Sequence, residues 1–218
     1  MNGILLIDKP KGWTSFDVVN YVRKKEAAAL GKKPKNVKVG HTGTLDPLAT
    51  GLLVLLVGKD FTRQAAELSR HDKTYQVTMR LGQTSTTGDE EGVKTDVSVQ
   101  QPTQESIQGV LQQFTGHLMQ TPPAYSAIKV NGQRAYDLAR AGKVVELQPR
   151  PVTVYACRLV AYEYPLVRFD CDVSSGTYIR TLAEDMGAAL GTGAYMADLR
   201  RTKVGEYSIV DAKSVADV

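Results

Sequence analysis

The sequence predicts an α+β fold in which helices and loops flank a mixed, largely antiparallel central sheet. Three observations support this fold class. Apolar and polar residues alternate over 75–81 and 167–173, a pattern typical of half-exposed strands. Apolar residues recur at helical spacing over 14–25, 105–114 and 177–190. Strands and helices do not alternate regularly along the chain, which disfavours a doubly wound parallel sheet.

The first elements are a short buried strand at 3–7 and the helix at 14–25. Thr14 is the expected N-cap of this helix, because Asp17 follows it at the spacing of a capping box. The helix is expected to bury one face, formed by Phe16, Val19 and Val22.

Six consecutive apolar residues at 52–57 predict a fully buried strand. Gly191 is placed to end the helix at 177–190. The polar segments 82–99 and 116–150 are expected to be loops, since Gly, Pro and acidic residues interrupt them. No linker is visible, so residues 1–218 are expected to form a single domain.

Composition excludes several classes of protein. The chain has 218 residues, of which 42% are hydrophobic and 23% charged, as in ordinary globular proteins. No apolar run is long enough to cross a bilayer, and no basic region precedes the N-terminal apolar residues. Two cysteines, Cys157 and Cys171, cannot build a disulfide scaffold or a four-ligand zinc site. A cytoplasmic protein without a membrane partner is therefore expected.

Positive charge is concentrated near the N-terminus. The whole chain has 27 Lys and Arg against 23 Asp and Glu, a net charge of +4. Residues 1–41 hold nine basic and three acidic residues, a net charge of +6, so the remainder sums to −2. A concentrated positive region attracts polyanions such as RNA. Charge alone favours ordinary solvated surface, however, and leaves RNA binding as the second interpretation.

The segment 40–53, GHTGTLDPLATGLL, holds the densest group of reactive and flexible residues. Its carboxylate, Asp46, can be a nucleophile, a base, a metal ligand or a turn cap, and the residues alone favour the cap. A metal site is disfavoured because His71 and His117 form no ligand-spaced cluster with His41. The chain has no phosphate-binding loop, dinucleotide fingerprint or nucleophile elbow, so no nucleotide cofactor and no serine hydrolase are expected.

This segment resembles the nucleophile motif of the TruB family of tRNA pseudouridine synthases. Further motifs of that family occur in order between residues 3 and 207. They are GILLIDKPKGWTS at 3–15, KTY at 73–75, PPAYSAIKVNG with RAY at 122–136, SGTYIRTL at 175–182 and LRRT at 199–202.

The resemblance implies a pseudouridine-synthase-like sheet and the isomerisation of a T-loop uridine, uridine 55, without a cofactor or a metal. It implies that Asp46 is the nucleophile, that Arg180 pairs with it, and that Tyr75 stacks on the base or handles a proton. His41 would displace bases of the tRNA loop, and Leu199 would form a wall of the pocket.

The substrate implied is the T arm of tRNA, and the enzyme is expected to be a monomer. Residues 116–150 are expected to be a loop-rich segment that contacts the RNA. The candidate phosphate contacts are Lys9, Lys11, Lys129, Arg134, Arg200 and Arg201. Few residues follow the last motif, so the C-terminal PUA domain of many members is expected to be absent.

Two other functions remain open from the sequence. One is a dyskerin-type catalytic subunit that needs a guide RNA and partner proteins. The other is a non-catalytic RNA-binding or tRNA-folding module, which Asp46 disfavours because a phosphate-facing surface gains nothing from a carboxylate.

Overall fold

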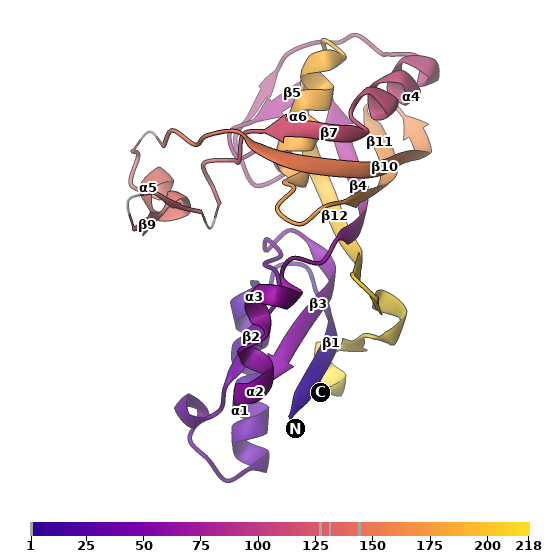
Figure 1. Cartoon of the computed structure of the whole chain (residues 1–218). Coiled ribbons are helices and arrows are strands. Elements are labelled where there is room, and N and C mark those ends of the chain that lie inside the picture. The colour runs from indigo at the N-terminus through magenta and orange to yellow at the C-terminus, as the bar shows by residue number, and fades with distance from the viewer. Residues whose placement is uncertain (1, 127, 131, 144) are drawn as a thin grey trace. The chain divides into compact units, whose positions relative to one another are not determined.

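A computed structural model describes residues 2–126, 128–130, 132–143 and 145–218. The chain divides into two compact units, which are described separately. Unit 1 comprises Met1–Gln76 and Leu199–Val218, and unit 2 comprises Val77–Asp198. The chain passes from unit 1 to unit 2 within strand β4 (Lys73–Leu81) and returns within strand β12 (Ala194–Val204) (Figure 1).

Unit 1 contains strands in the order β14-β1-β3-β12, with β2 beside β3 and β13 beside β12. Strand β3 is antiparallel to β1 and β2 and parallel to β12, while β1 is parallel to β14. The bounds are β1 (Gly3–Lys9), β2 (Val39–His41), β3 (Thr50–Val57), β13 (Tyr207–Ser208), β14 (Lys213–Ser214), α1 (Ser15–Ala29), α2 (Lys59–Thr62), α3 (Ala65–Leu68), η1 (Pro34–Asn36), η2 (Ile209–Asp211) and η3 (Val215–Asp217).

Strand β3 is the centre of unit 1, as its apolar sequence predicts. Every residue from Gly51 to Val57 is buried. Its two faces pack in separate clusters. Leu53, Leu55 and Val57 meet residues of α1 and β1 in one cluster, whereas Leu52 and Val54 pack with Val204 in the other. The predicted buried strand at 52–57 is therefore confirmed.

Helix α1 begins as predicted. The Asp17 amide donates to Thr14 Oγ1 at 3.0 Å, and the Thr14 amide donates to Asp17 Oδ2 at 2.9 Å. The buried face is corrected at one position, because Phe16 is 60% exposed. At 100° per residue Phe16 lies about 200° around the helix from Val18, which is completely buried.

Unit 2 has strands β4, β11, β10 and β7 in that order, with β12 next to β4. Strand β10 is antiparallel to both of its neighbours. Helix α4 packs against β10 and also contacts α6. The bounds are β5 (Gln83–Ser85), β6 (Lys94–Asp96), α4 (Gln104–Gln113), β7 (Gly116–Gln120), β8 (Lys129–Val130), β9 (Gln133–Arg134), α5 (Ala135–Arg140), β10 (Arg150–Glu163), β11 (Leu166–Val173) and α6 (Ile179–Ala189).

The α+β fold with a largely antiparallel mixed sheet is confirmed. The predicted strands at 75–81 and 167–173 are β4 and β11, whose alternate residues are buried. The predicted helices are α4 and α6, and Gly191 has a φ of +69° just after α6. Two predicted loops are corrected: 82–99 contains the β5–β6 hairpin, and 116–150 contains β7, β8, β9 and α5. Strands β10 and β12 were not predicted.

Among the helices that the structure describes, none combines the length and the apolar character needed to cross a bilayer.

Candidate active site

Asp46 lies in the loop that joins β2 to β3 in unit 1. The side chain is partly buried. At the start of the loop the Thr42 amide donates to the Val54 carbonyl at 3.1 Å, and near its end the Ala49 amide donates to the Asp46 carbonyl at 3.1 Å. The loop is thus attached to β3 and turns directly after Asp46.

The first residue of α1 and the segment that leads into this helix fix the backbone on both sides of Asp46. Ser15 is buried, and its hydroxyl donates to the Leu45 carbonyl at 3.0 Å while accepting from the Leu45 amide at 2.8 Å. The Gly12 amide donates to the Pro47 carbonyl at 2.8 Å. These bonds hold both neighbours of Asp46 and so give the carboxylate a defined position.

Lys9 lies beneath this arrangement rather than on the surface. Its side chain has no exposed area, and Nζ donates to the carbonyls of Pro10 at 2.9 Å, Trp13 at 2.6 Å and Pro47 at 3.4 Å. Burial lowers the pKa of Lys9 to about 8; the charge of Asp46 opposes this shift and that of Arg201 adds to it. The expected phosphate contact is corrected here, because this ammonium group binds the loop backbone instead.

The expected phosphate contact of Arg201 is corrected for the same reason, because this side chain is also buried. It is 1% exposed, Nε donates to the Leu52 carbonyl at 2.8 Å, and an NH2 group donates to the Gly43 carbonyl at 3.0 Å. Close approach of the backbones accounts for Gly51, which has a φ of +101°. A Cβ atom there would lie 2.3 Å from the Arg201 carbonyl oxygen.

A further buried cation, Lys73, donates from Nζ to the carbonyls of Ser69 and His71. Burial, with a smaller contribution from the charge of Arg201, lowers the pKa of Lys73 to about 8. His41 is partly exposed, and its buried Nδ1 has no hydrogen-bond partner among the described residues. Burial, with a smaller contribution from Arg201, lowers the pKa of His41, so the ring is neutral at pH 7.

The remaining predicted residues of unit 1 divide into buried and exposed groups. Tyr75 and Leu199 are each 7% exposed. Lys11 is exposed. Arg200 is partly exposed and forms a bidentate ion pair with Asp8, with N–O distances of 2.7 and 3.1 Å. Lys11 and Arg200 therefore remain candidates for phosphate contacts.

Arg180 lies in unit 2, at the second residue of α6, and is 6% exposed. Its guanidinium donates to the carbonyls of Thr87 at 3.2 Å and Tyr125 at 2.8 Å, and its Nε lies 3.9 Å from Asp89 Oδ2. Asp89 thus supplies a carboxylate near a cation at a helix N-terminus. The pairing of Arg180 with Asp46 stays a prediction.

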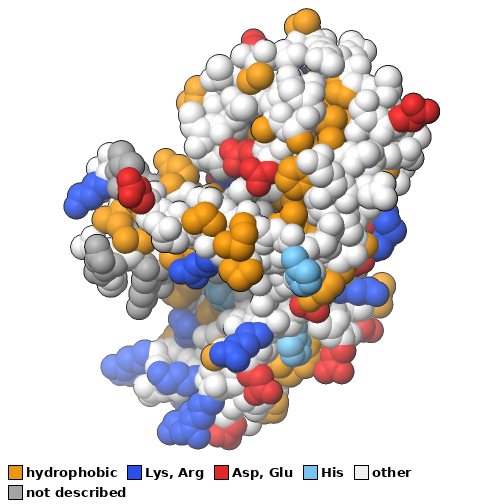
Figure 2. All heavy atoms as spheres, turned by 45° about the horizontal axis from the view of Figure 1, so that its top comes forward, with side chains coloured by type: hydrophobic (Ala, Val, Ile, Leu, Met, Phe, Trp, Pro, Cys, Tyr) orange, Lys and Arg blue, Asp and Glu red, His pale blue; other side chains and the backbone are white. Residues whose placement is uncertain are grey.

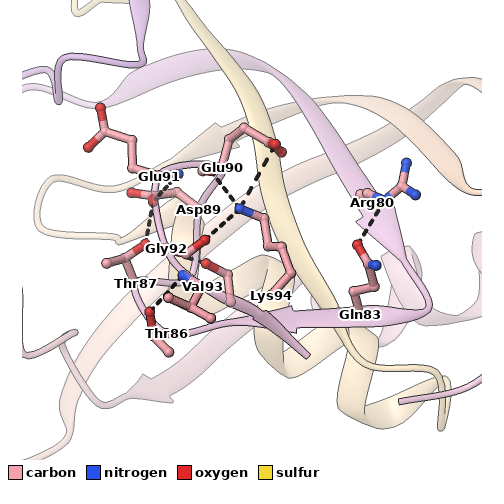
Figure 3. Close-up of polar contacts among 11 residues, drawn as sticks. Arg80, Gln83, Thr86, Thr87, Asp89, Glu90, Glu91, Gly92, Val93 and Lys94 are labelled. Atoms are coloured by element: carbon pink, nitrogen blue, oxygen red, sulfur yellow. Dashed lines mark hydrogen bonds and ion pairs between the residues drawn. The ribbon is translucent and has the colours of Figure 1, made fainter. Parts of the chain in front are cut away.

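Asp89 is a residue that the sequence analysis missed. It is 4% exposed, and its Oδ1 accepts from Thr87 Oγ1 at 2.5 Å and from the Glu91 amide at 3.1 Å (Figure 3). Lys94 donates to the carbonyls of Glu90 and Gly92 in the same turn. The only sequence signal was a Thr-x-Asp spacing in an acidic segment, a pattern shared by many exposed turns.

Gln120 was missed as well. This buried residue ends β7, and its amide accepts from the Tyr178 amide at 2.8 Å and donates to the Tyr178 carbonyl at 3.0 Å. Tyr178 is the N-cap of α6 but makes no side-chain capping bond. Gln120 therefore fixes the start of the helix that positions Arg180.

Lys129 and Arg134 pair through their backbones in the β8–β9 hairpin. Their side chains lie outside the described part of the structure, so their expected phosphate contacts stay predictions.

Comparison with known proteins identifies the family. A model of the TruB family pseudouridylate synthase N-terminal domain matches residues 30–179. The chain belongs to the TruB family. A model of the tRNA pseudouridylate synthase B C-terminal domain matches residues 180–218.

Relatives of this TruB-family chain are named tRNA pseudouridine synthase B. The Burkholderia lata protein is 46% identical over all of this chain and 66% of its own length. The Solibacter usitatus protein is 44% identical over 99% of this chain and 71% of its own length. The chain therefore spans about two thirds of the length of these relatives.

Two solved structures are similar to this chain in fold. A Cbf5-Nop10-Gar1 complex matches with a TM-score of 0.73 and 29% identity, over 99% of this chain and 53% of the other. An H/ACA RNP bound to a substrate RNA containing 2′-deoxyuridine matches with a TM-score of 0.70 and 28% identity, over 99% and 51% respectively. The pseudouridine-synthase-like fold is thus confirmed.

Proposed function

We propose that this chain isomerises a uridine of tRNA to pseudouridine, with Asp46 as the nucleophile. Relatives named tRNA pseudouridine synthase B align with the whole chain at 43 to 46% identity. The observation that carries the proposal is the fixed position of the Asp46 loop, whose backbone is held by Ser15 and Gly12. A nucleophile in a defined position converts binding energy into reaction rate.

In the proposed reaction the bond between uracil N1 and ribose C1′ breaks, the base turns, and C5 bonds to C1′. C5 loses a proton and N1 gains one, so substrate and product are isomers and no oxidant, reductant or water is consumed. Asp46 bonds transiently either to C1′ or to the base, and both routes release the free carboxylate at the end.

The target base must leave its stack before it can react, which costs a few kcal/mol. In our proposal the ring of Tyr75 stacks on the extruded base or its hydroxyl handles the C5 proton, and Leu199 forms a wall of the pocket. His41 takes the place of displaced bases, for which a neutral ring is suited. Arg180 pairs with Asp46.

We propose the T arm of tRNA, at uridine 55, as the substrate, and the cytoplasm as the place of action. Lys11, Lys129, Arg134 and Arg200 are the phosphate contacts in this proposal, and residues 116–150 approach the RNA. Action as a monomer also stays a prediction.

A guide-RNA-dependent function is the second candidate, since a structural neighbour is a Cbf5-Nop10-Gar1 complex. That neighbour is 29% identical to this chain, whereas the tRNA-directed relatives are 43 to 46% identical. The closer similarity favours a stand-alone enzyme. Incubating the chain alone with an unmodified tRNA transcript separates the two: product in the T loop excludes a need for guide RNA.

The direct test uses tRNA tritiated at uracil C5, because the reaction releases this hydrogen to water. Asp46→Asn should reduce tritium release at least about a thousandfold, as loss of a nucleophile does in other enzymes, and should leave RNA binding intact. Asp60→Asn is the matched control, since Asp60 is an exposed carboxylate of the same unit. Full activity of Asp46→Asn would refute the nucleophile, and an inactive wild type that binds RNA would favour a non-catalytic module.

A further inference from the structure

Unit 1 has a basic groove outside the Asp46 loop. The groove measures about 340 Å³ and lies between α1, η1 and β2. Its lining includes four cationic side chains and no acidic one: Arg23, Lys24, Lys35 and Lys38. These residues belong to the N-terminal stretch whose net charge is +6. Several Lys and Arg side chains are visible on the surface of unit 1 (Figure 2).

The lysines of this groove differ from Lys9 and Arg201 in their exposure to solvent. Lys24, Lys35 and Lys38 are exposed. Within the described part of the chain, no carboxylate lies at salt-bridge distance from any of these three lysines. Three uncompensated charges on one groove attract an anion, and repel each other until one binds.

Arg23 lines the groove and is held in place by hydrogen bonds within unit 1. Its Nη1 donates to Asn20 Oδ1 at 2.8 Å, and its Nη2 donates to the Val39 carbonyl at 3.2 Å. Its guanidinium also lies 5.9 Å from the centre of the Phe16 ring. Two of five N–H donors are thus used inside the unit, which fixes the plane of the group and leaves donors for a ligand.

We propose that this groove binds the phosphate backbone of the substrate RNA at nucleotides other than the target uridine, without reading sequence. The proposal rests on the proposed function, because it takes tRNA as the polyanion. Lysines bind phosphates as point charges, and an arginine in a fixed plane can donate to two phosphate oxygens. Contacts to phosphate carry no direct sequence information, so the proposed contact contributes affinity and not specificity.

The test is the salt dependence of binding to an unmodified tRNA transcript. The groove variant Lys24→Gln/Lys35→Gln/Lys38→Gln should lower the slope of log affinity against log salt by about 2 to 3, because each phosphate contact contributes about 0.7 to 0.9. Binding at 50 mM KCl should weaken at least about tenfold, KM should rise accordingly, and kcat should be unchanged.

The matched control is Lys59→Gln/Lys203→Gln/Lys213→Gln, which removes three exposed charges of unit 1 outside the groove. A wild-type slope in the control, with a reduced slope in the groove variant, supports the site. Equal slopes in the two variants would overturn it, as would a groove variant that binds like the wild type. Thermal unfolding confirms that both variants fold.

Failure of the groove and failure of the proposed function give different results. If the wild type releases no tritium from tRNA, the proposed function fails, while the salt slopes still report on the groove. If the wild type is active and the slopes agree, the groove proposal alone is refuted.

Discussion

The pKa of Lys9 gives a quantitative prediction for the variant Lys9→Met. Methionine has similar length and no charge, so it keeps the packing and removes the ammonium group that binds the carbonyls of Pro10, Trp13 and Pro47. Burial lowers the pKa of Lys9 in the folded protein from 10.5 to about 8. Between these two values the unfolded chain holds a proton that the folded chain has lost.

Unfolding therefore takes up a proton in this window, and raising the pH disfavours unfolding. The contribution of Lys9 to stability is lowest below pH 8 and rises towards pH 10.5. Relative to pH 7, the free energy of unfolding of the wild type minus that of Lys9→Met should rise by about 1 kcal/mol at pH 9 and by about 2 to 3 kcal/mol at pH 10. Lys73, whose pKa is also lowered to about 8, cancels in this difference because both proteins contain it.

The measurement is urea unfolding of both proteins at pH 7, 8, 9 and 10. Lys203→Met is the control, since Lys203 is exposed, and its curve should run parallel to that of the wild type. Lys9→Met should also lower kcat about tenfold or more, because the Asp46 loop loses a bond at Pro47 and small displacements of a nucleophile are costly. A stability difference that stays constant from pH 7 to pH 10 would refute the buried, weakly basic lysine.

Two further variants test the two units separately, Asp89→Asn in unit 2 and Gly51→Ala in unit 1. Asp89→Asn removes the carboxylate 3.9 Å from Arg180 Nε but keeps a group that can accept from Thr87; kcat in the tritium assay should fall about tenfold to a hundredfold with tRNA affinity retained, and unchanged kcat would show that Asp89 does not position Arg180. Gly51→Ala places a Cβ atom 2.3 Å from the Arg201 carbonyl oxygen at a φ of +101°; urea unfolding should show a loss of about 3 kcal/mol or more from backbone strain and displacement of β12, and a change below about 1 kcal/mol would contradict this close packing.

Elements with a clear period could be predicted from the sequence. The apolar run of β3, the alternation of β4 and β11 and the capping box of α1 each state their structure locally. Strand β10 was missed because its 14 residues contain register shifts near Val154 and Leu159, which break the alternation. Strand β12 was missed because it contains the adjacent arginines Arg200 and Arg201, which read as surface.

Burial of charge could not be predicted. Lys9 and Arg201 carry the same sequence signal as exposed cations, and their burial depends on carbonyl groups that lie far away in the sequence, such as Pro47 and Gly43. The buried carboxylate of Asp89 likewise has its cationic partner in Arg180, which lies 91 residues later in the sequence. Such partners are chosen by tertiary structure, and a single sequence contains no local record of them.

The positive charge of unit 1 therefore serves two purposes that composition merges. Lys9 and Arg201 are withdrawn from water and donate to the backbone around Asp46, where salt hardly screens them. Lys24, Lys35 and Lys38 are exposed to solvent, where each charge is available to a phosphate and is screened by salt. The basic residues of unit 1 thus hold the backbone around Asp46 with their buried members and, in our proposal, provide affinity for RNA with their exposed ones. The two effects can be separated by experiment because only the second depends on ionic strength.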